Sequence, residues 1–189
     1  MPFIETNIKG LVIFDPQVWG DDRGYFYESY NANTFKAAGL DADFVQDNQA
    51  YSSYGVLRGL HYQVGEYAQA KLVRCIQGEV LDVVVDIRPD SDTYGQHLCV
   101  LLNEDNKRQL FVPRGFAHGY VVLSNTALFA YKCDNFYSKN HEGGLAYNDS
   151  TLNIDWKIAP KDALLSEKDT TQPRLGDHLA YYEMYSTAL

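Results

Sequence analysis

Short apolar segments separated by turn residues make up most of the chain. These segments lie at residues 11–14, 44–49, 71–76, 80–88, 97–102, 109–112, 119–123 and 128–137. Strands this short and closely spaced are typical of an antiparallel sandwich or barrel. We therefore predict an all-β fold, a jelly-roll barrel with a few short helices, whose interior can hold a ligand.

Residues 80–88 show the clearest alternation. Leu81, Val83, Val85 and Ile87 alternate with more polar positions that include Asp82. This period of two predicts a strand with one buried face, which leaves Asp82 on the solvent side.

Helical signals are few. Asn31 or Asn33 is placed to cap a short helix over residues 34–38, and Gly39 follows as its stop. Residues 1–189 fit one domain. The tyrosine-rich tail, about residues 175–189, is expected to pack on the barrel or on a partner subunit.

Candidate chemistry is densest in the stretch GVLRGLHYQ, residues 55–63. His61 is suited to taking up and returning a proton near neutral pH, and Arg58 to binding a phosphate or carboxylate. Regular pleating places these two side chains on opposite faces. They share a cavity only if the strand bulges between them, and Gly59 is the residue that permits such a bulge.

Composition excludes several partners. The 189 residues carry 16 Lys and Arg against 25 Asp and Glu, a net charge of −9, which repels nucleic acid and anionic membranes. The three cysteines show no disulfide or zinc spacing. The first residues lack the features of a signal peptide and no apolar run approaches membrane length, so we expect a cytoplasmic protein.

The segment PRGFAHG, residues 113–119, matches the second half of the cupin signature, in which such a histidine often binds metal. His118, His61 and Glu66 form a possible facial site. However, Gln63 stands where the first half of the signature has a second histidine. We therefore expect no metal and no other cofactor, and a metal-dependent oxygenase remains an alternative.

Several motifs together resemble one family, the dTDP-4-dehydrorhamnose 3,5-epimerases, which are metal-free cupins. The resemblance runs from about Phe3 to Asp169 and rests on GVLRGLHYQ (55–63), KLVR (71–74), GEV (78–80), VDIR (85–88), KRQL (107–110), GFAHG (115–119) and YK (131–132). It implies epimerisation at C3 and C5 of dTDP-4-dehydro-6-deoxy-D-glucose, through an enolate, in dTDP-L-rhamnose biosynthesis.

The resemblance also implies roles for individual residues. His61 is the base, oriented by Asp169; Tyr131 is the acid on the opposite face of the sugar; and Lys71 is the cation near the C4 oxygen. The implied contacts to the dTDP-linked 4-keto-6-deoxy sugar are Arg23, Glu28, Gln46, Asn48, Arg58, His118, Tyr137, which stacks on the base, Glu142 and Lys168. The segment with Arg23 and Glu28 is expected to reach into a neighbouring subunit of a homodimer.

The chemistry is consistent with these residue types. Removing a hydrogen beside a ketone gives an enolate, so inversion needs a base on one face, an acid on the other and a cation or donor at the oxygen. Two other functions remain open. One is epimerisation at a single carbon, or ketone isomerisation, on a related nucleotide sugar. The other is a non-catalytic module that binds a nucleotide sugar.

Overall fold

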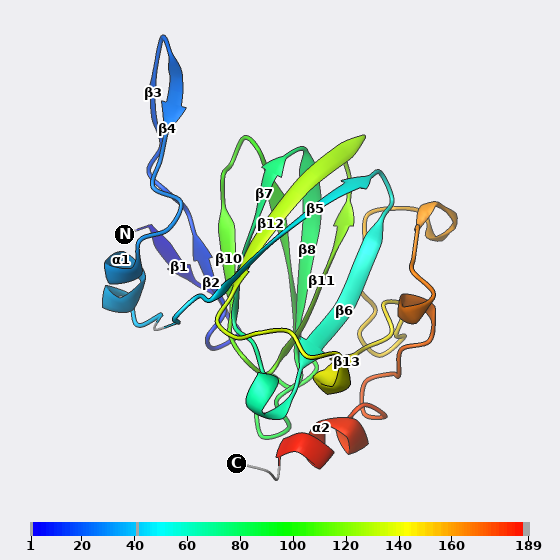
Figure 1. Cartoon of the computed structure of the whole chain (residues 1–189). Coiled ribbons are helices and arrows are strands. Elements are labelled where there is room, and N and C mark those ends of the chain that lie inside the picture. The colour runs from blue at the N-terminus through cyan, green and yellow to red at the C-terminus, as the bar shows by residue number, and fades with distance from the viewer. Residues whose placement is uncertain (1, 41, 187–189) are drawn as a thin grey trace.

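In the computed structural model, which describes residues 2–40 and 42–186, two antiparallel sheets face each other (Figure 1). The first sheet has the order β1 (Phe3–Glu5), β2 (Val12–Phe14), β10 (Gln109–Val112), β7 (Lys71–Gln77), β12 (Thr126–Cys133), β5 (Gln46–Ser53). The second has the order β13 (Glu142–Gly144), β6 (Leu57–Gln63), β11 (Phe116–Val122), β8 (Glu79–Asp86), β9 (His97–Asn103). The predicted all-β architecture is confirmed.

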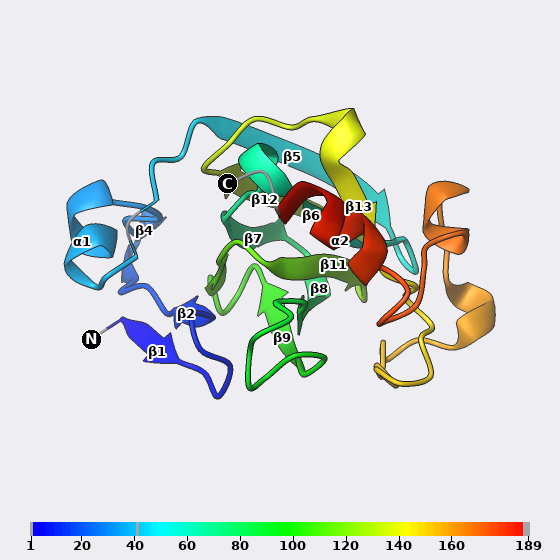
Figure 2. The ribbon, with the colours of Figure 1, turned by 90° about the horizontal axis from the view of Figure 1, so that it is seen from below.

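Helices are short and lie outside the sheets (Figure 2). They are α1 (Ala32–Ala37), α2 (Leu179–Ser186) and the 3-10 turns η1 (Gly65–Tyr67), η2 (Lys139–His141), η3 (Pro160–Asp162) and η4 (Lys168–Thr170). The predicted cap of α1 is confirmed, because the side chain of Asn31 accepts hydrogen bonds from the backbone of Asn33 and Thr34. Within the described residues, neither α-helix has the length and apolar content needed to cross a membrane.

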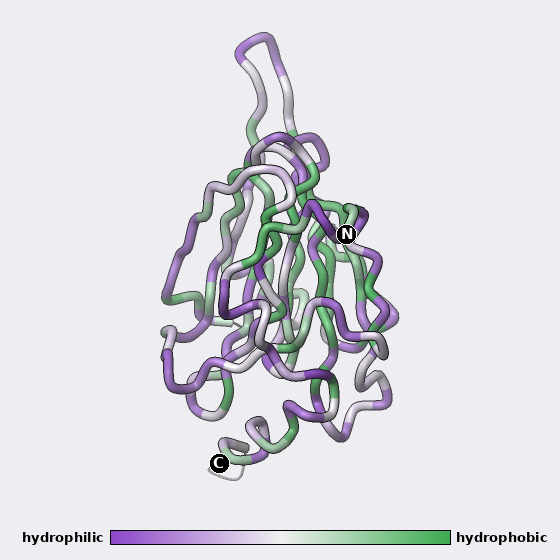
Figure 3. Tube along the Cα trace, turned by 90° about the vertical axis from the view of Figure 1, so that its right-hand side faces the viewer, coloured by the Kyte–Doolittle hydropathy of each residue, from purple (hydrophilic) through white to green (hydrophobic). Residues whose placement is uncertain are grey.

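Hydrophobic residues concentrate along the strands (Figure 3). One cluster, with Val84 and Phe129, joins residues of both sheets, and a second, with Val83 and Trp156, packs residues of the second sheet against later segments. Strand β8 contributes to both clusters. The prediction of one buried face for this strand is therefore wrong: both faces are covered, and Asp82 is fully buried.

Strand β6 bulges where the sequence predicted. His61 is paired with His118 and Arg58 with Tyr120, so β6 advances three residues where β11 advances two. Gly59 lies inside this bulge with a φ of +134°. The bulge brings Arg58 and His61 to the same cavity.

Strands β3 (Trp19–Asp21) and β4 (Gly24–Phe26) form a separate hairpin that extends away from the barrel (Figure 1). Three of its aromatic side chains are largely solvent-exposed: Trp19 by 56%, Tyr25 by 62% and Phe26 by 70%. Exposed aromatics grouped on one element mark it as a surface suited to contact with another protein.

Candidate active site

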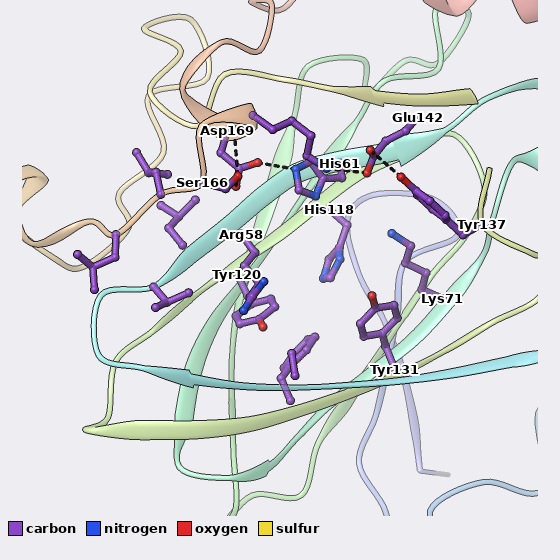
Figure 4. Close-up of a pocket in the computed structure, with 17 residues that line it drawn as sticks. Arg58, His61, Lys71, His118, Tyr120, Tyr131, Tyr137, Glu142, Ser166 and Asp169 are labelled. Carbon is purple, nitrogen blue, oxygen red and sulfur yellow. Dashed lines mark hydrogen bonds and ion pairs between the residues drawn. The ribbon is translucent and has the colours of Figure 1, made fainter. Parts of the chain in front are cut away.

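A cavity of about 590 Å³ opens between the two sheets. The second sheet contributes Arg58 and His61 from β6 and His118 from β11, and the first contributes Lys71 from β7 and Tyr131 from β12. Figure 4 shows these side chains directed into the shared space. Residues far apart in the sequence are thus brought together by the pairing of strands.

His61 and Asp169 form a tight pair. The Nε2 atom of His61 lies 2.5 Å from Oδ1 of Asp169, and the Ser166 hydroxyl donates to Oδ2 of the same carboxylate at 2.7 Å. Burial of Asp169 opposes its ionisation, but the hydrogen bonds from His61 and Ser166 outweigh burial and lower its pKa. An ionised Asp169 accepts the Nε2 hydrogen of His61, which leaves Nδ1 as the nitrogen that can take up a proton.

Tyr131 and Lys71 stand on the opposite sheet. The Lys71 ammonium lies 5.9 Å from the centre of the Tyr131 ring. Burial raises the pKa of Tyr131 to about 12, and burial lowers the pKa of Lys71. The phenol therefore keeps its proton at neutral pH, as an acid must, next to an amine that can donate to an oxygen.

His118 has a carboxylate partner of its own. Its Nε2 atom lies 2.8 Å from Oδ2 of Asp82, and Oδ1 of Asp82 is buried with no hydrogen-bond partner among the described residues. On the same floor of the cavity, Arg58 donates to the Ser52 hydroxyl at 3.3 Å. The site therefore contains two imidazole–carboxylate pairs, and their histidines lie on the neighbouring strands β6 and β11.

A polar rim closes one side of the cavity. Glu142 accepts a hydrogen bond from the Tyr137 hydroxyl at 3.1 Å and forms an ion pair with Lys168 at 2.8 Å. All three residues line the cavity. Because Lys168 immediately precedes Asp169, this ion pair also anchors the η4 turn that carries the partner of His61.

Gln46 and Asn48 line an adjoining pocket on strand β5, together with Lys71, Tyr131 and Tyr137. Their side chains are hydrogen-bonded to each other at 3.1 Å. These two predicted contacts therefore lie beside the main cavity, next to the rim.

Arg23 and Glu28 are not brought to the cavity of their own chain. Arg23 lies in the β3–β4 hairpin and forms an ion pair with Asp21, while Glu28 accepts a hydrogen bond from Asn31 at 3.1 Å. Neither residue lines the cavity.

The alternative metal site is not assembled by these residues. Nε2 of His61 and Nε2 of His118 each face a carboxylate, and Glu66 is exposed on η1 and does not line the cavity. Within residues 2–40 and 42–186, no three histidine, cysteine, aspartate or glutamate side chains are grouped to hold a metal ion.

Sequence reasoning missed three polar residues: Asp82 beneath His118, Tyr120, which lines the cavity, and Ser166, which supports Asp169. Asp82 and Tyr120 are register partners on β8 and β11. The alternation of β8 placed Asp82 in solvent. The one sequence signal for a role of Asp82 was the presence of a carboxylate within a strand that is otherwise rich in valine.

Comparison with known proteins agrees with this geometry. A family model described as dTDP-4-dehydrorhamnose 3,5-epimerase matches residues 5–177. The dTDP-4-dehydrorhamnose 3,5-epimerase of Shigella flexneri is 51% identical over 178 residues, which cover 94% of this chain and 97% of that protein.

Solved structures give the same result. The dTDP-4-dehydrorhamnose 3,5-epimerase of Elizabethkingia anophelis is 55% identical with a TM-score of 0.89, covering 93% of this chain and 96% of that one. The dTDP-6-deoxy-D-glucose-3,5-epimerase of Legionella pneumophila, solved with dTDP-4-keto-L-rhamnose, is 47% identical with a TM-score of 0.88, covering 92% of each chain. The predicted cupin-type fold is confirmed, and the chain belongs to the dTDP-4-dehydrorhamnose 3,5-epimerase family.

Proposed function

We propose that the cavity epimerises C3 and C5 of dTDP-4-dehydro-6-deoxy-D-glucose to give dTDP-4-dehydro-L-rhamnose, in dTDP-L-rhamnose biosynthesis. Membership of the family supports this activity. The observation that carries the proposal is the placement of His61 and Tyr131 on facing sheets, directed into one cavity (Figure 4).

Each inversion begins with the base. Nδ1 of His61 removes the proton from the carbon beside the C4 ketone, and the electron pair moves onto the C4 oxygen to give an enolate. Asp169 holds the Nε2 hydrogen at 2.5 Å and stabilises the imidazolium that forms. A positioned base of this kind typically contributes ~10²–10⁴-fold in rate.

The enolate is then stabilised and protonated from the other side. Lys71 donates to the developing negative charge at the C4 oxygen, an interaction typically worth on the order of 10²–10³-fold. Tyr131 gives its phenolic proton to the opposite face of the carbon, which inverts the centre. The His61 imidazolium releases its proton to solvent and the Tyr131 phenolate takes one up from solvent, so both groups are restored before the second carbon reacts.

The nucleotide is expected along the rim. In this proposal Tyr137 stacks on the base, and Arg58, His118, Glu142 and Lys168 contact the sugar and the diphosphate. Gln46 and Asn48, in the adjoining pocket, complete the contacts. Although the chain has a net charge of −9, the positively charged side chains of Arg58 and Lys168 bind the phosphates locally in this proposal.

The active form in this proposal is a homodimer. Arg23 and Glu28 are remote from the cavity of their own chain, and the hairpin that carries Arg23 exposes three aromatic side chains. Insertion of this hairpin beside the partner's cavity buries those rings and delivers both polar residues. The same proposal places the enzyme in the cytoplasm, with a nucleotide sugar as its partner and neither nucleic acid nor membrane.

Solvent exchange tests the reaction directly. With the dTDP-linked 4-keto-6-deoxy sugar in deuterated water, NMR of the product from the wild-type chain should show deuterium at both C3 and C5. His61→Asn should abolish exchange at both carbons. Tyr131→Phe should retain exchange through His61 but lose inversion. Without the phenol, His61 can return a deuteron only to the face of the carbon from which it removed the proton.

The other outcomes identify the alternatives. Exchange and inversion at one carbon only indicates a single-carbon epimerase. Binding of the nucleotide sugar without exchange in the wild-type chain indicates a binding module, and it defeats the proposed reaction.

A further inference from the structure

Two of the three rim residues, Tyr137 and Glu142, lie close together in the chain and line the cavity. Tyr137 lies in the connection between β12, which ends at Cys133, and β13, which begins at Glu142. Their side chains are joined by the hydrogen bond between the Tyr137 hydroxyl and Glu142. The η2 turn lies between these two residues and does not itself line the cavity. Because it connects them, a shift of this turn would move both side chains.

The C-terminal helix α2 holds this turn. The hydroxyls of Tyr181 and Tyr185 both donate to the carbonyl oxygen of Asn140, at 2.9 and 3.3 Å. A spacing of four residues places both tyrosines on one face of α2. One carbonyl oxygen has two lone pairs and can accept both hydrogen bonds.

Ring contacts reinforce the attachment. The His141 ring lies 4.4 Å from the ring of Tyr67 and 4.8 Å from that of Tyr185, measured between ring centres, and Nδ1 of His141 lies 2.8 Å from the Ser138 hydroxyl. A Cβ on Gly65 would lie only 3.2 Å from the Tyr185 backbone, so η1 and α2 are in close contact. Figure 2 shows α2 lying across this end of the barrel.

We propose that α2 positions the rim, and that Tyr181 and Tyr185 are positioning residues for nucleotide binding. They act on Asn140 and His141, and through them on Tyr137 and Glu142. In the described structure neither the His61–Asp169 hydrogen bond nor the contact between Lys71 and the Tyr131 ring involves this helix. Helix α2 lies beyond residues 5–177, the range that the family model matches.

The inference rests on the proposed function, because it assigns the rim to the nucleotide. It predicts that loss of the support from α2 changes the affinity for the nucleotide sugar and leaves the rate of the chemical step unchanged. Loosening the rim weakens binding of substrate and product alike, which raises KM, whereas the proton transfers between His61, the sugar and Tyr131 keep their rate.

The double variant Tyr181→Phe/Tyr185→Phe tests this, because it removes both hydroxyls and keeps both rings. We expect KM, and the Kd for dTDP measured by calorimetry, to rise about tenfold, the weight of roughly one neutral hydrogen bond. We expect kcat to stay within about twofold of wild type. Amide hydrogen exchange over residues 138–142 should accelerate in the same variant.

Met184→Ala is the matched control, since Met184 lies on the same helix but is 67% exposed. It should leave KM, kcat and dTDP binding unchanged. Wild-type affinity for dTDP in the double variant overturns the inference, as does a fall in kcat at unchanged affinity. If the double variant unfolds, the single variant Tyr181→Phe serves the same test, with the smaller rise in Kd expected for one hydroxyl.

Failure of the proposed function gives a different result. In that case the wild-type chain does not bind dTDP or does not exchange C3 and C5 hydrogens. Binding of dTDP by the wild-type chain, with or without turnover, allows the role of α2 to be judged separately.

Discussion

Individual side chains in the cavity are oriented by hydrogen bonds with neighbouring residues. Asp169 orients His61 and is itself held by Ser166, while Asp82 orients His118 from within the core. Such supporting residues fix the tautomer and the ring direction of an imidazole. The chemistry of the site therefore depends on buried carboxylates as much as on the imidazole rings.

Tyr131 should remain protonated far into the alkaline range. Burial raises its pKa to about 12, whereas a free tyrosine ionises near pH ~10. Between these values the folded chain holds a proton that the unfolded chain has lost. The stability contributed by this group is therefore complete below pH ~10 and disappears as the pH rises through about 12.

Spectrophotometric titration measures this directly. The tyrosinate absorbance of the wild-type chain minus that of Tyr131→Phe should show a single step near pH 12. A difference step near pH ~10 would show that the phenol is not shielded.

The residues predicted from sequence were those carried by local motifs. GVLRGLHYQ and GFAHG identified His61, Arg58 and His118, and all three line the cavity. Asp82 could not be assigned in this way, because its role follows from the register of β8 against β11, which places it opposite Tyr120 and within reach of His118. Register is a property of two strands, and neither strand alone encodes it.

At the scale of elements, the bulge at Gly59 in β6 allows two side chains of one strand to line the same cavity. Without it, Arg58 and His61 would point to opposite faces of the sheet. From the sequence, Gly59 was identified as the residue that permits this bulge. The sequence did not predict that β8 is covered on both faces, since the covering layer comes from residues such as Trp156 and Leu175, far along the chain.

Gly59→Ala should disrupt this element. At a φ of +134°, the new Cβ would lie 2.5 Å from Cα of Gly119 on the neighbouring strand. We expect a loss of at least about 1–3 kcal/mol in the free energy of unfolding, from the backbone conformation alone. We also expect a large fall in kcat, because relieving the contact moves His61.

Gly39→Ala is the matched control for backbone strain. Gly39 also has a positive φ, +79°, but it follows α1, and a Cβ there would meet nothing within 4 Å. This variant should lose stability without losing kcat. Equal kcat in the two variants would show that the bulge does not position the base.

At the scale of the whole molecule, the proposed catalytic residues and the proposed docking element lie in different parts of the fold. The two sheets carry the proposed acid, base and cation, while the β3–β4 hairpin extends beyond them (Figure 1). The family resemblance implied that the segment with Arg23 reaches into a neighbouring subunit, and Arg23 does not line the cavity of its own chain. The arrangement predicts a cavity completed by the partner's hairpin.

Complementation between two defective chains tests this arrangement. Arg23→Ala removes the hairpin cation from both cavities of a dimer, and His61→Asn removes the base from both. In a mixed dimer, the Arg23→Ala chain keeps its own His61 and receives an intact Arg23 from its partner. Random pairing of equal amounts makes half of the dimers mixed, each with one complete cavity, so activity should recover to about a quarter of wild type.

The matched control co-expresses the wild-type chain with the double variant Arg23→Ala/His61→Asn. The same numbers of intact and altered residues are present, but no mixed dimer contains a complete cavity, so its mixed dimers should add no activity to that of the wild-type homodimers. If the hairpin instead serves its own chain, the outcomes reverse: the first mixture gains nothing, and each mixed dimer of the control keeps one working site. The two mixtures therefore decide whether Arg23 acts within its own chain or across the dimer, provided that each variant alone is close to inactive.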